Sequence, residues 1–241
     1  MPKNQPIELP DLDLDEIADD AAEPEAAGGD RRSSKIVIYG GIGRYSDVDP
    51  RAVISQIDAA EADGAQSIDV HINSPGGSVF DGVAIYNALL QSPLRVRVVI
   101  DGLAASAASL IAMGADTIEI AKNGRLMIHR ARAAVFGPAA SMRKMAQILD
   151  GIDADLVQTY ADRTGQDPAE IKKLVNAETW LTAARAVELG FADKISGAAA
   201  GDGGAKNTAD EAEIAASAAD EARRIYVRRL QIETLNPLED K

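Results

Sequence analysis

Apolar runs of strand length alternate with helical periods between residues 35 and 195. Strand-like runs cover residues 36–39, 67–72, 94–100, 117–120 and 125–128. Helical spacing of apolar residues separates them over residues 52–60, 79–90 and 104–113. In the second of these helices, the pattern places Val79, Val83, Tyr86 and Leu90 on one face. This alternation predicts an α/β fold with a mostly parallel sheet and crossover helices.

A longer amphipathic pattern follows Gly137 and Pro138. Apolar residues recur every three or four positions over residues 139–161, at Met142, Met145, Ile148, Leu149, Ile152 and Leu156. This spacing predicts one long helix, which Gly165 and Pro168 end. Shorter helices are expected over residues 168–175 and 182–189.

Three flanking segments differ in composition from this domain, which we place at residues 35–195. Residues 1–34 carry ten acidic and three basic side chains, so we expect a disordered segment, either a solvated tail or a pro-segment or partner-binding arm. Residues 196–207 are rich in Gly and Ala and predict a flexible linker. Residues 208–241 predict a helical tail, docked on a partner or free in solvent.

Composition narrows the possible functions. The 241 residues are 46% hydrophobic, enough for one sizeable domain. A net charge of −13 argues against nucleic-acid binding. No apolar run reaches membrane-spanning length and the N-terminus lacks a signal core, so we expect no membrane contact and a cytoplasmic location. With no cysteine and two histidines, neither a metal nor another cofactor is expected.

Ser106 is a candidate nucleophile. It stands where an apolar strand gives way to a helix of small residues, close to the unpaired amides of a first helical turn. Spacing alone favours a packing or capping serine in an Ala-rich helix over a nucleophile. Ser109, one helical turn later, is the competing nucleophile, although it would point along the helix.

His129 is a candidate base. It follows the apolar strand that ends at Ile128, 23 residues after Ser106, and can titrate near neutrality. The other histidine, His71, lies inside a strand, and we expect it to have a structural or surface role.

Gly76 and Gly77 form a turn between a strand and a helix. Their amides carry no side chain to block access, so the turn can accept an anion. A plain tight turn is the alternative. The pattern is not a phosphate-binding loop, because the spacing GxxxxGK[ST] is absent.

Three segments together resemble the Clp protease proteolytic subunit (ClpP) family. They are Asn-Ser-Pro-Gly-Gly at 73–77, Gly-Leu-Ala-Ala-Ser-Ala at 102–107 and Met-Ile-His at 127–129. The amino-acid sequence of residues 38–40, 80–89 and 178–183 resembles the phage branch of the family, the head maturation proteases. The resemblance covers about residues 35–195. It implies a ClpP/crotonase-like fold with a protruding helical handle at residues 139–161.

The same resemblance implies a serine endopeptidase. Ser106 would be the nucleophile, His129 the base, and the amides of Gly77 and Ala107, beside Gly76, the oxyanion hole. The third triad member is open. Alignment puts Leu174 at the aspartate position, and the polar candidates nearby are Asn176 and Glu178; we favour Asn176. The other candidates are Asp153, Asp155 and no side chain at all.

The resemblance also implies a cyclic homo-oligomer that acts on polypeptides, here phage scaffold and capsid proteins. Residues 130–137 would pair with an extended substrate strand. Three alternatives remain: a proteolytic subunit fed by an ATP-dependent unfoldase, a crotonase-like acyl-CoA enzyme, and an inactive structural ring subunit.

Overall fold

The computed structural model describes residues 33–197 as an α/β fold built on one seven-stranded sheet. Five parallel strands form its main path in the order β1 (Ser33–Tyr39), β2 (Ser67–Ser74), β3 (Arg95–Ala105), β4 (Thr117–Ala121) and β7 (Lys194–Ser196). Off this path, β5 (Arg125–Ile128) is parallel to the end of β3, and β6 (Thr179–Thr182) is antiparallel to β5. The predicted mostly parallel sheet is confirmed. The predictions for residues 1–32 and 198–241 lie outside the described residues.

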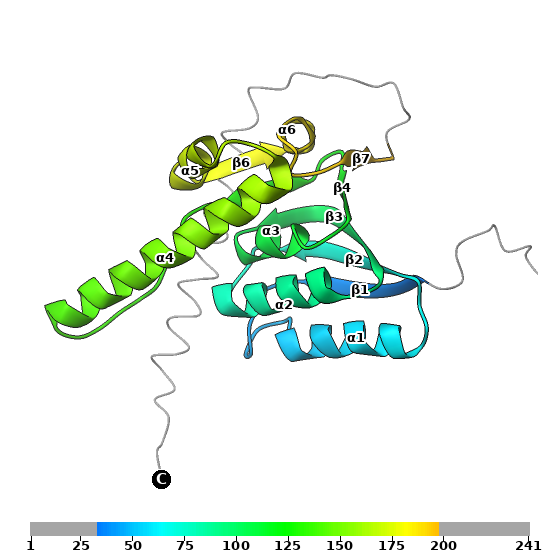
Figure 1. Cartoon of the computed structure of the whole chain (residues 1–241), viewed down its shortest axis with the longest axis horizontal. Helices are drawn as coiled ribbons and strands as arrows, with labels where there is room; N and C mark the ends of the chain where they lie inside the picture. The colour runs from blue at the N-terminus through cyan, green and yellow to red at the C-terminus, as the bar shows by residue number, and fades with distance from the viewer. Residues whose placement is uncertain (1–32, 198–241) are drawn as a thin grey trace, which may run out of the picture. The chain divides into compact units, whose positions relative to one another are not determined.

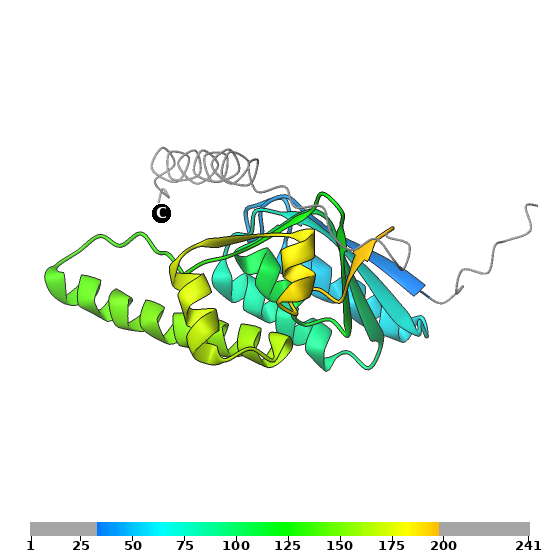
Figure 2. The same ribbon diagram turned by 90° about the horizontal axis from the view of Figure 1, so that it is seen from above.

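Helices connect these strands, as Figures 1 and 2 show. In chain order they are α1 (Pro50–Ala62), α2 (Val79–Gln91), α3 (Ala107–Ala112), α4 (Ala139–Thr164), α5 (Pro168–Asn176) and α6 (Ala183–Glu188). Local signals set their starts. Asp49 caps α1 ahead of Pro50, and the Ser78 hydroxyl accepts a hydrogen bond from the amide of Asp81 in α2.

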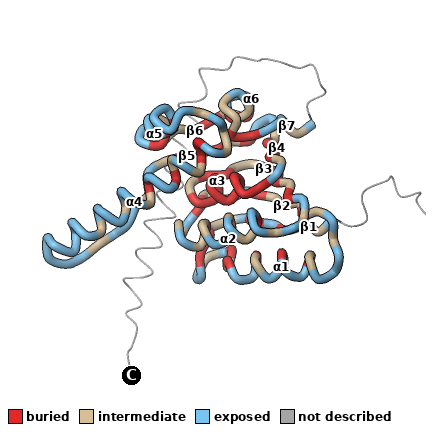
Figure 3. The backbone as a smooth tube through the Cα atoms, in the orientation of Figure 1, coloured by how far each residue is buried: buried red, intermediate tan, exposed pale blue. Residues whose placement is uncertain are grey.

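The core lies between the sheet and the helices α1, α2 and α3. Burial alternates along β2, where Ile68, Val70 and Ile72 are fully buried and the residues between them are not. Figure 3 shows buried positions gathered in the strands and in α3. Each such side chain contributes about 1.5–3 kcal/mol on transfer from water. The core therefore fixes which residues of each strand face away from the helices.

The sheet positions between these buried residues carry charged side chains that bond across strands. Arg97 on β3 bonds Asp69 on β2 at 2.8 Å and Glu119 on β4 at 3.0 Å, and Lys194 on β7 bonds Glu119 at 3.0 Å. The hydrogen bond from Arg97 lowers the pKa of Asp69. These pairs link four neighbouring strands on one side of the sheet.

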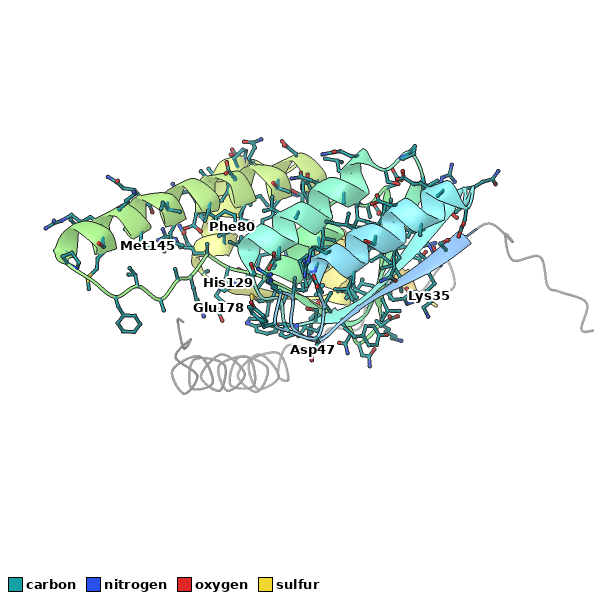
Figure 4. All side chains as sticks on the ribbon, turned by 90° about the horizontal axis from the view of Figure 1, so that it is seen from below. Lys35, Asp47, Phe80, His129, Met145 and Glu178 are labelled. Atoms are coloured by element: carbon teal, nitrogen blue, oxygen red, sulfur yellow. The ribbon has the colours of Figure 1, made fainter. Side chains whose placement is uncertain are left out.

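Helix α4 confirms the long helix expected after Pro138 and projects beyond the sheet (Figure 1). Its buried residues, Asp153, Leu156, Tyr160 and Ala161, all lie in the second half. In the first half Met142 is 49% exposed, and Met145 lies far along the projecting rod in Figure 4. The helix ends at Gly165, whose left-handed φ of 68° suits glycine.

Two local predictions are wrong. We expected a helix over 104–113, but β3 runs on to Ala105 because Leu103 and Ala104 pair with Arg125 and Leu126 of β5. We also placed Leu90 on the packed face of α2, but it is 60% exposed. The buried residues of α2 are Gly82, Ile85 and Leu89.

Candidate active site

The backbone at Ser106 turns sharply between β3 and α3. Its φ of 56° and ψ of −124° form a backbone conformation that residues other than glycine rarely adopt. The amide of Ser106 donates to the carbonyl of Met127 on β5 at 3.0 Å, next to the pair Ala105–Met127. The strand pairing that extends β3 therefore also holds the strained serine beside the end of β5.

His129 lies directly after β5 and faces this serine. Its Nε2 is 2.8 Å from the Ser106 hydroxyl oxygen. Burial lowers the pKa of His129, the nearby Arg132 guanidinium lowers it further, and the carboxylates of Glu178 and Asp153 act in the opposite direction. A neutral imidazole with an unprotonated Nε2 can accept the serine proton. The structure thus brings the two predicted catalytic side chains together.

Ser109 points away from this pair. Its hydroxyl donates to the carbonyl of Ser106 at 2.7 Å and lies 2.9 Å from the Tyr160 hydroxyl on α4. Since the single Ser109 proton is used on the carbonyl, Tyr160 is the donor in the second bond. Burial raises the pKa of Tyr160 to about 12, which keeps it protonated. Ser109 therefore supports the turn at Ser106 instead of competing with it.

The glycine turn is fixed from below by Ser74, a fully buried residue. The Ser74 hydroxyl donates to the Gly40 carbonyl at 2.6 Å and accepts from the Gly76 amide at 3.1 Å. The carbonyl of Gly76 in turn accepts from the amide of Ile42 at 2.9 Å. Of the two glycine amides, that of Gly77 alone makes no hydrogen bond within residues 33–197.

Gly76 also touches the serine turn. A Cβ atom added there would stand 2.7 Å from the Ser106 Cβ and 2.9 Å from the Ala107 nitrogen. The amide of Ala107, like that of Gly77, has no hydrogen-bond acceptor within the described part of the chain. Two unoccupied amides thus flank the serine, an arrangement that can hold a developing oxyanion.

The third triad position is less simple than the sequence suggested. His129 Nδ1 is buried and has no hydrogen-bond partner within residues 33–197. Asn176, at the end of α5, is exposed and makes no hydrogen bond to it there. The structure therefore does not bring Asn176 to the histidine.

Asp155 and Asp153 are two further candidates for the third triad position. Asp155 is exposed on α4. Asp153 accepts from the Ala131 amide at 2.7 Å and from Arg130 Nε at 2.5 Å, so both of its oxygens are in use. These bonds anchor the segment after the histidine to α4.

Glu178 is the remaining candidate. It has a left-handed φ of 51°, and its charge raises the pKa of His129. Figure 4 shows Glu178 and His129 at the same edge of the molecule, with Phe80 of α2 and Asp47 of the β1–α1 connection labelled for orientation. The Glu178 carboxylate is bonded to Arg132 instead of the histidine. Glu178 is therefore near enough to act on His129 but is engaged elsewhere.

His71 lies apart from this site, as expected. Its Nδ1 is 2.8 Å from the Asp101 carboxylate, which also accepts from the Tyr39 hydroxyl at 2.8 Å. This cluster sits with Lys35 and its neighbours on the charged side of the sheet, around strands β1, β2 and β3.

Three residues that shape the site were missed in the sequence: Ser74, Tyr160 and Arg132. Ser74 had a usable signal, since it lies within the Asn-Ser-Pro-Gly-Gly segment. Tyr160 lies 51 residues from Ser109, and Arg132 lies 46 residues from Glu178. No local pattern reports contacts at such separations.

Within residues 33–197, no group of three or more His, Asp or Glu side chains is arranged to hold a metal ion. In the same residues, no helix combines the length and the apolar character needed to cross a membrane.

Comparison with known proteins agrees with this geometry. The family model described as Clp protease matches residues 32–199. ATP-dependent Clp protease proteolytic subunit 1 of Mycobacterium tuberculosis (strain ATCC 25618 / H37Rv) is 30% identical over 168 residues, which is 69% of this chain and 84% of the relative. Proteolytic subunit 2 of Corynebacterium diphtheriae is 33% identical over 58% of this chain and 71% of its own length, and that of Thermobifida fusca is 35% identical over 55% and 66%.

The fold, the serine–histidine contact and these matches define a class, the serine endopeptidases built on this α/β scaffold. Within that class, the chain belongs to the Clp protease family. The match favours a protease over the crotonase-like acyl-CoA alternative.

Proposed function

We propose that this protein hydrolyses peptide bonds with Ser106 as nucleophile and His129 as general base. The observation that carries the proposal is the 2.8 Å contact between the serine hydroxyl and Nε2 of a part-buried histidine. The Ser106 oxygen attacks the peptide carbonyl carbon while His129 takes its proton. His129 then gives that proton to the leaving amine, and a water molecule hydrolyses the acyl-enzyme by the same route.

The amides of Gly77 and Ala107 donate to the oxyanion in each tetrahedral intermediate. Both are free of other acceptors within residues 33–197, and Gly76 packs directly against the Ala107 nitrogen. The Gly76 amide does not join them, because it is bonded to Ser74. Loss of one such donor typically reduces the rate constant about 10²–10³-fold.

Glu178, and not Asn176, is the residue that orients His129 during catalysis, once its carboxylate leaves the Arg132 guanidinium. A carboxylate that accepts from Nδ1 fixes the tautomer in which Nε2 is free, and it stabilises the imidazolium formed during catalysis. Glu178 is 34% exposed at its side chain and close enough to raise the pKa of His129. Asp153 is already satisfied by Ala131 and Arg130.

The substrates are phage scaffold and capsid proteins, cleaved by a cyclic homo-oligomer during head assembly. The resemblance of residues 38–40, 80–89 and 178–183 to the phage sequences supports these substrates. The apolar residues Met142 and Ile148 are 49% and 42% exposed on the projecting half of α4, which supports contact between subunits there.

A second candidate is a proteolytic subunit that an ATP-dependent unfoldase supplies with substrate. The similar proteins of Mycobacterium tuberculosis and Corynebacterium diphtheriae, which are ATP-dependent Clp protease proteolytic subunits, support it. A matching ATPase would then be the partner, and folded proteins would resist cleavage without it.

One experiment tests both candidates. The purified protein and its Ser106→Ala variant are incubated, without nucleotide, with a permanently unfolded polypeptide and with an assembled scaffold–capsid shell. Head maturation predicts Ser106-dependent cleavage of both substrates. Cleavage of the unfolded chain alone would favour the ATP-dependent candidate, and equal cleavage by the Ser106→Ala variant would refute the proposed nucleophile.

A further inference from the structure

Arg132 and Glu178 form an ion pair beside His129 that connects two distant parts of the chain. Arg132 lies three residues after His129, and Glu178 lies between α5 and β6. The Arg132 side chain is 63% exposed and that of Glu178 is 34% exposed. The pair therefore lies between solvent and the part-buried histidine, whose Nδ1 is buried.

Glu178 occupies this place at a conformational cost. Its φ of 51° lies in the left-handed region, which non-glycine residues rarely adopt because it is strained. A strained backbone at a functional site persists because the surrounding structure imposes it. Here the strained residue presents the carboxylate that binds Arg132, close to His129 along the β5–β6 pairing of Ile128 with Thr179.

His129 lacks a hydrogen-bond acceptor for Nδ1, which a catalytic triad requires. Nδ1 of His129 is buried without an acceptor within the described residues, which is a costly state for a polar N–H group. One nearby carboxylate, Asp153, is committed to Ala131 and Arg130. The other, Glu178, is held by Arg132. The site is therefore one hydrogen bond short of a complete triad.

The segment that carries Arg132 is also the one placed to receive substrate. Residues 130–138 belong to no helix or strand, and 132–136 donate no backbone hydrogen bond to another backbone group within residues 33–197. Such an open, extended segment can add a peptide strand beside the nucleophile. A bound peptide would then bring its own side chains close to the Arg132 guanidinium.

We propose that Arg132 is a substrate-sensing latch that selects peptides with an acidic side chain near the scissile bond. In the free enzyme Arg132 holds Glu178 away from His129. A substrate Asp or Glu takes over the guanidinium, and Glu178 is released to accept the hydrogen bond from His129 Nδ1. This inference rests on the proposed function and adds to it a substrate class and a means of activation.

The solvent exposure of the Arg132–Glu178 ion pair determines how much its opening changes the reaction rate. A solvent-exposed ion pair shifts an equilibrium by only about two- to fivefold. The latch is thus weak enough for one substrate carboxylate to open, and high salt should weaken it as well. Removal of the arginine should raise the rate by a similar factor of about two to five.

The first test measures the rate at which a fluorophosphonate labels Ser106, with no peptide present. We compare the wild type with Arg132→Gln, with Arg132→Gln/Glu178→Gln, and with Arg143→Gln as the matched control, since Arg143 is an exposed arginine on α4. Arg132→Gln should label about two- to fivefold faster, and the added Glu178→Gln should abolish that gain. An Arg132→Gln rate equal to that of the control, or below it, overturns the latch.

The second test uses pairs of fluorogenic peptides that differ only by Glu or Gln at one position within three residues of the scissile bond. The wild type should cleave the Glu peptide about two- to fivefold faster at one of these positions or more. Arg132→Gln should lose this preference while it cleaves the Gln peptide faster. An unchanged Glu/Gln ratio in Arg132→Gln overturns the proposed selectivity.

The two proposals fail in different ways. If Ser106 is labelled in the wild type but Arg132→Gln behaves as Arg143→Gln does, the latch is wrong and the serine protease mechanism stands. If Ser106 is labelled in neither the wild type nor Arg132→Gln, both proposals fall. Labelling confined to Arg132→Gln would support both.

Discussion

Gly76 is a position where a single methyl group would strike the nucleophile turn directly. In Gly76→Ala the new Cβ would lie 2.6 Å from the Ala105 carbonyl oxygen, 2.7 Å from the Ser106 Cβ and 2.9 Å from the Ala107 nitrogen. The φ of 91° adds strain for any L side chain. About 1–2 kcal/mol for the backbone and about 1–3 kcal/mol for the overlap give a loss of about 2–5 kcal/mol in the free energy of unfolding.

Two other glycines separate these contributions. Gly64 has a φ of 72° but nothing within 4 Å of its added Cβ, so Gly64→Ala should show the backbone cost alone. Gly151 lies inside α4 with the same open surroundings, so Gly151→Ala should stabilise the helix by about 0.5–1 kcal/mol.

The assay combines urea unfolding at one fixed protein concentration with the rate of fluorophosphonate labelling. Gly76→Ala should lose both stability and labelling, because the neighbours that must move are the serine and the Ala107 amide. Gly64→Ala should lose stability and keep its labelling rate. A Gly76→Ala protein that labels at the wild-type rate would refute the proposed apposition of the glycine turn and the nucleophile.

Further predictions concern the pKa of His129, the Tyr160–Ser109 hydrogen bond and the Asp153 contacts that anchor the segment after His129. Because burial and then Arg132 lower the pKa of His129 from 6.5, the base stays neutral as the pH falls past that value. The acid limb of kcat/KM should therefore lie below pH 6.5, and a limb above it would contradict this. Tyr160→Phe removes the hydroxyl bonded to Ser109, and urea unfolding should show a loss of about 0.5–1.5 kcal/mol. Asp153→Asn should slow labelling of the serine, because it loosens the segment after the histidine, whereas the exposed Asp155→Asn should not; equal rates would contradict the anchor.

Regular elements were predictable where local pattern and tertiary packing agree. The alternation of Ile68, Val70 and Ile72 gives β2, and the spacing after Pro138 gives α4. Packing overrode the pattern where they disagree. Leu103, Ala104 and Ala105 favour a helix by intrinsic propensity, and their pairing with β5 overrides that preference.

The site divides in the same way. Ser106, His129 and the glycine turn lie in short segments of distinctive amino-acid sequence. These segments allowed the pairing of Ser106 with His129 to be predicted, and the structure contains that contact. The candidates for the partner of His129 Nδ1, Asn176 and Glu178, lie 47 and 49 residues after it in the chain, so no local pattern distinguishes them. The turn between α5 and β6, where Glu178 has a left-handed φ of 51°, sets the direction of that carboxylate and is not visible in the sequence.

The most direct measurement is mass spectrometry of the protein after reaction with a fluorophosphonate, beside the Ser106→Ala variant. A part-buried His129 with a lowered pKa, 2.8 Å from the hydroxyl, predicts one adduct, on the peptide that contains Ser106, and none in the variant. An adduct on another serine, or equal labelling of the variant, would contradict the assignment of Ser106 as the nucleophile of this Clp protease family member.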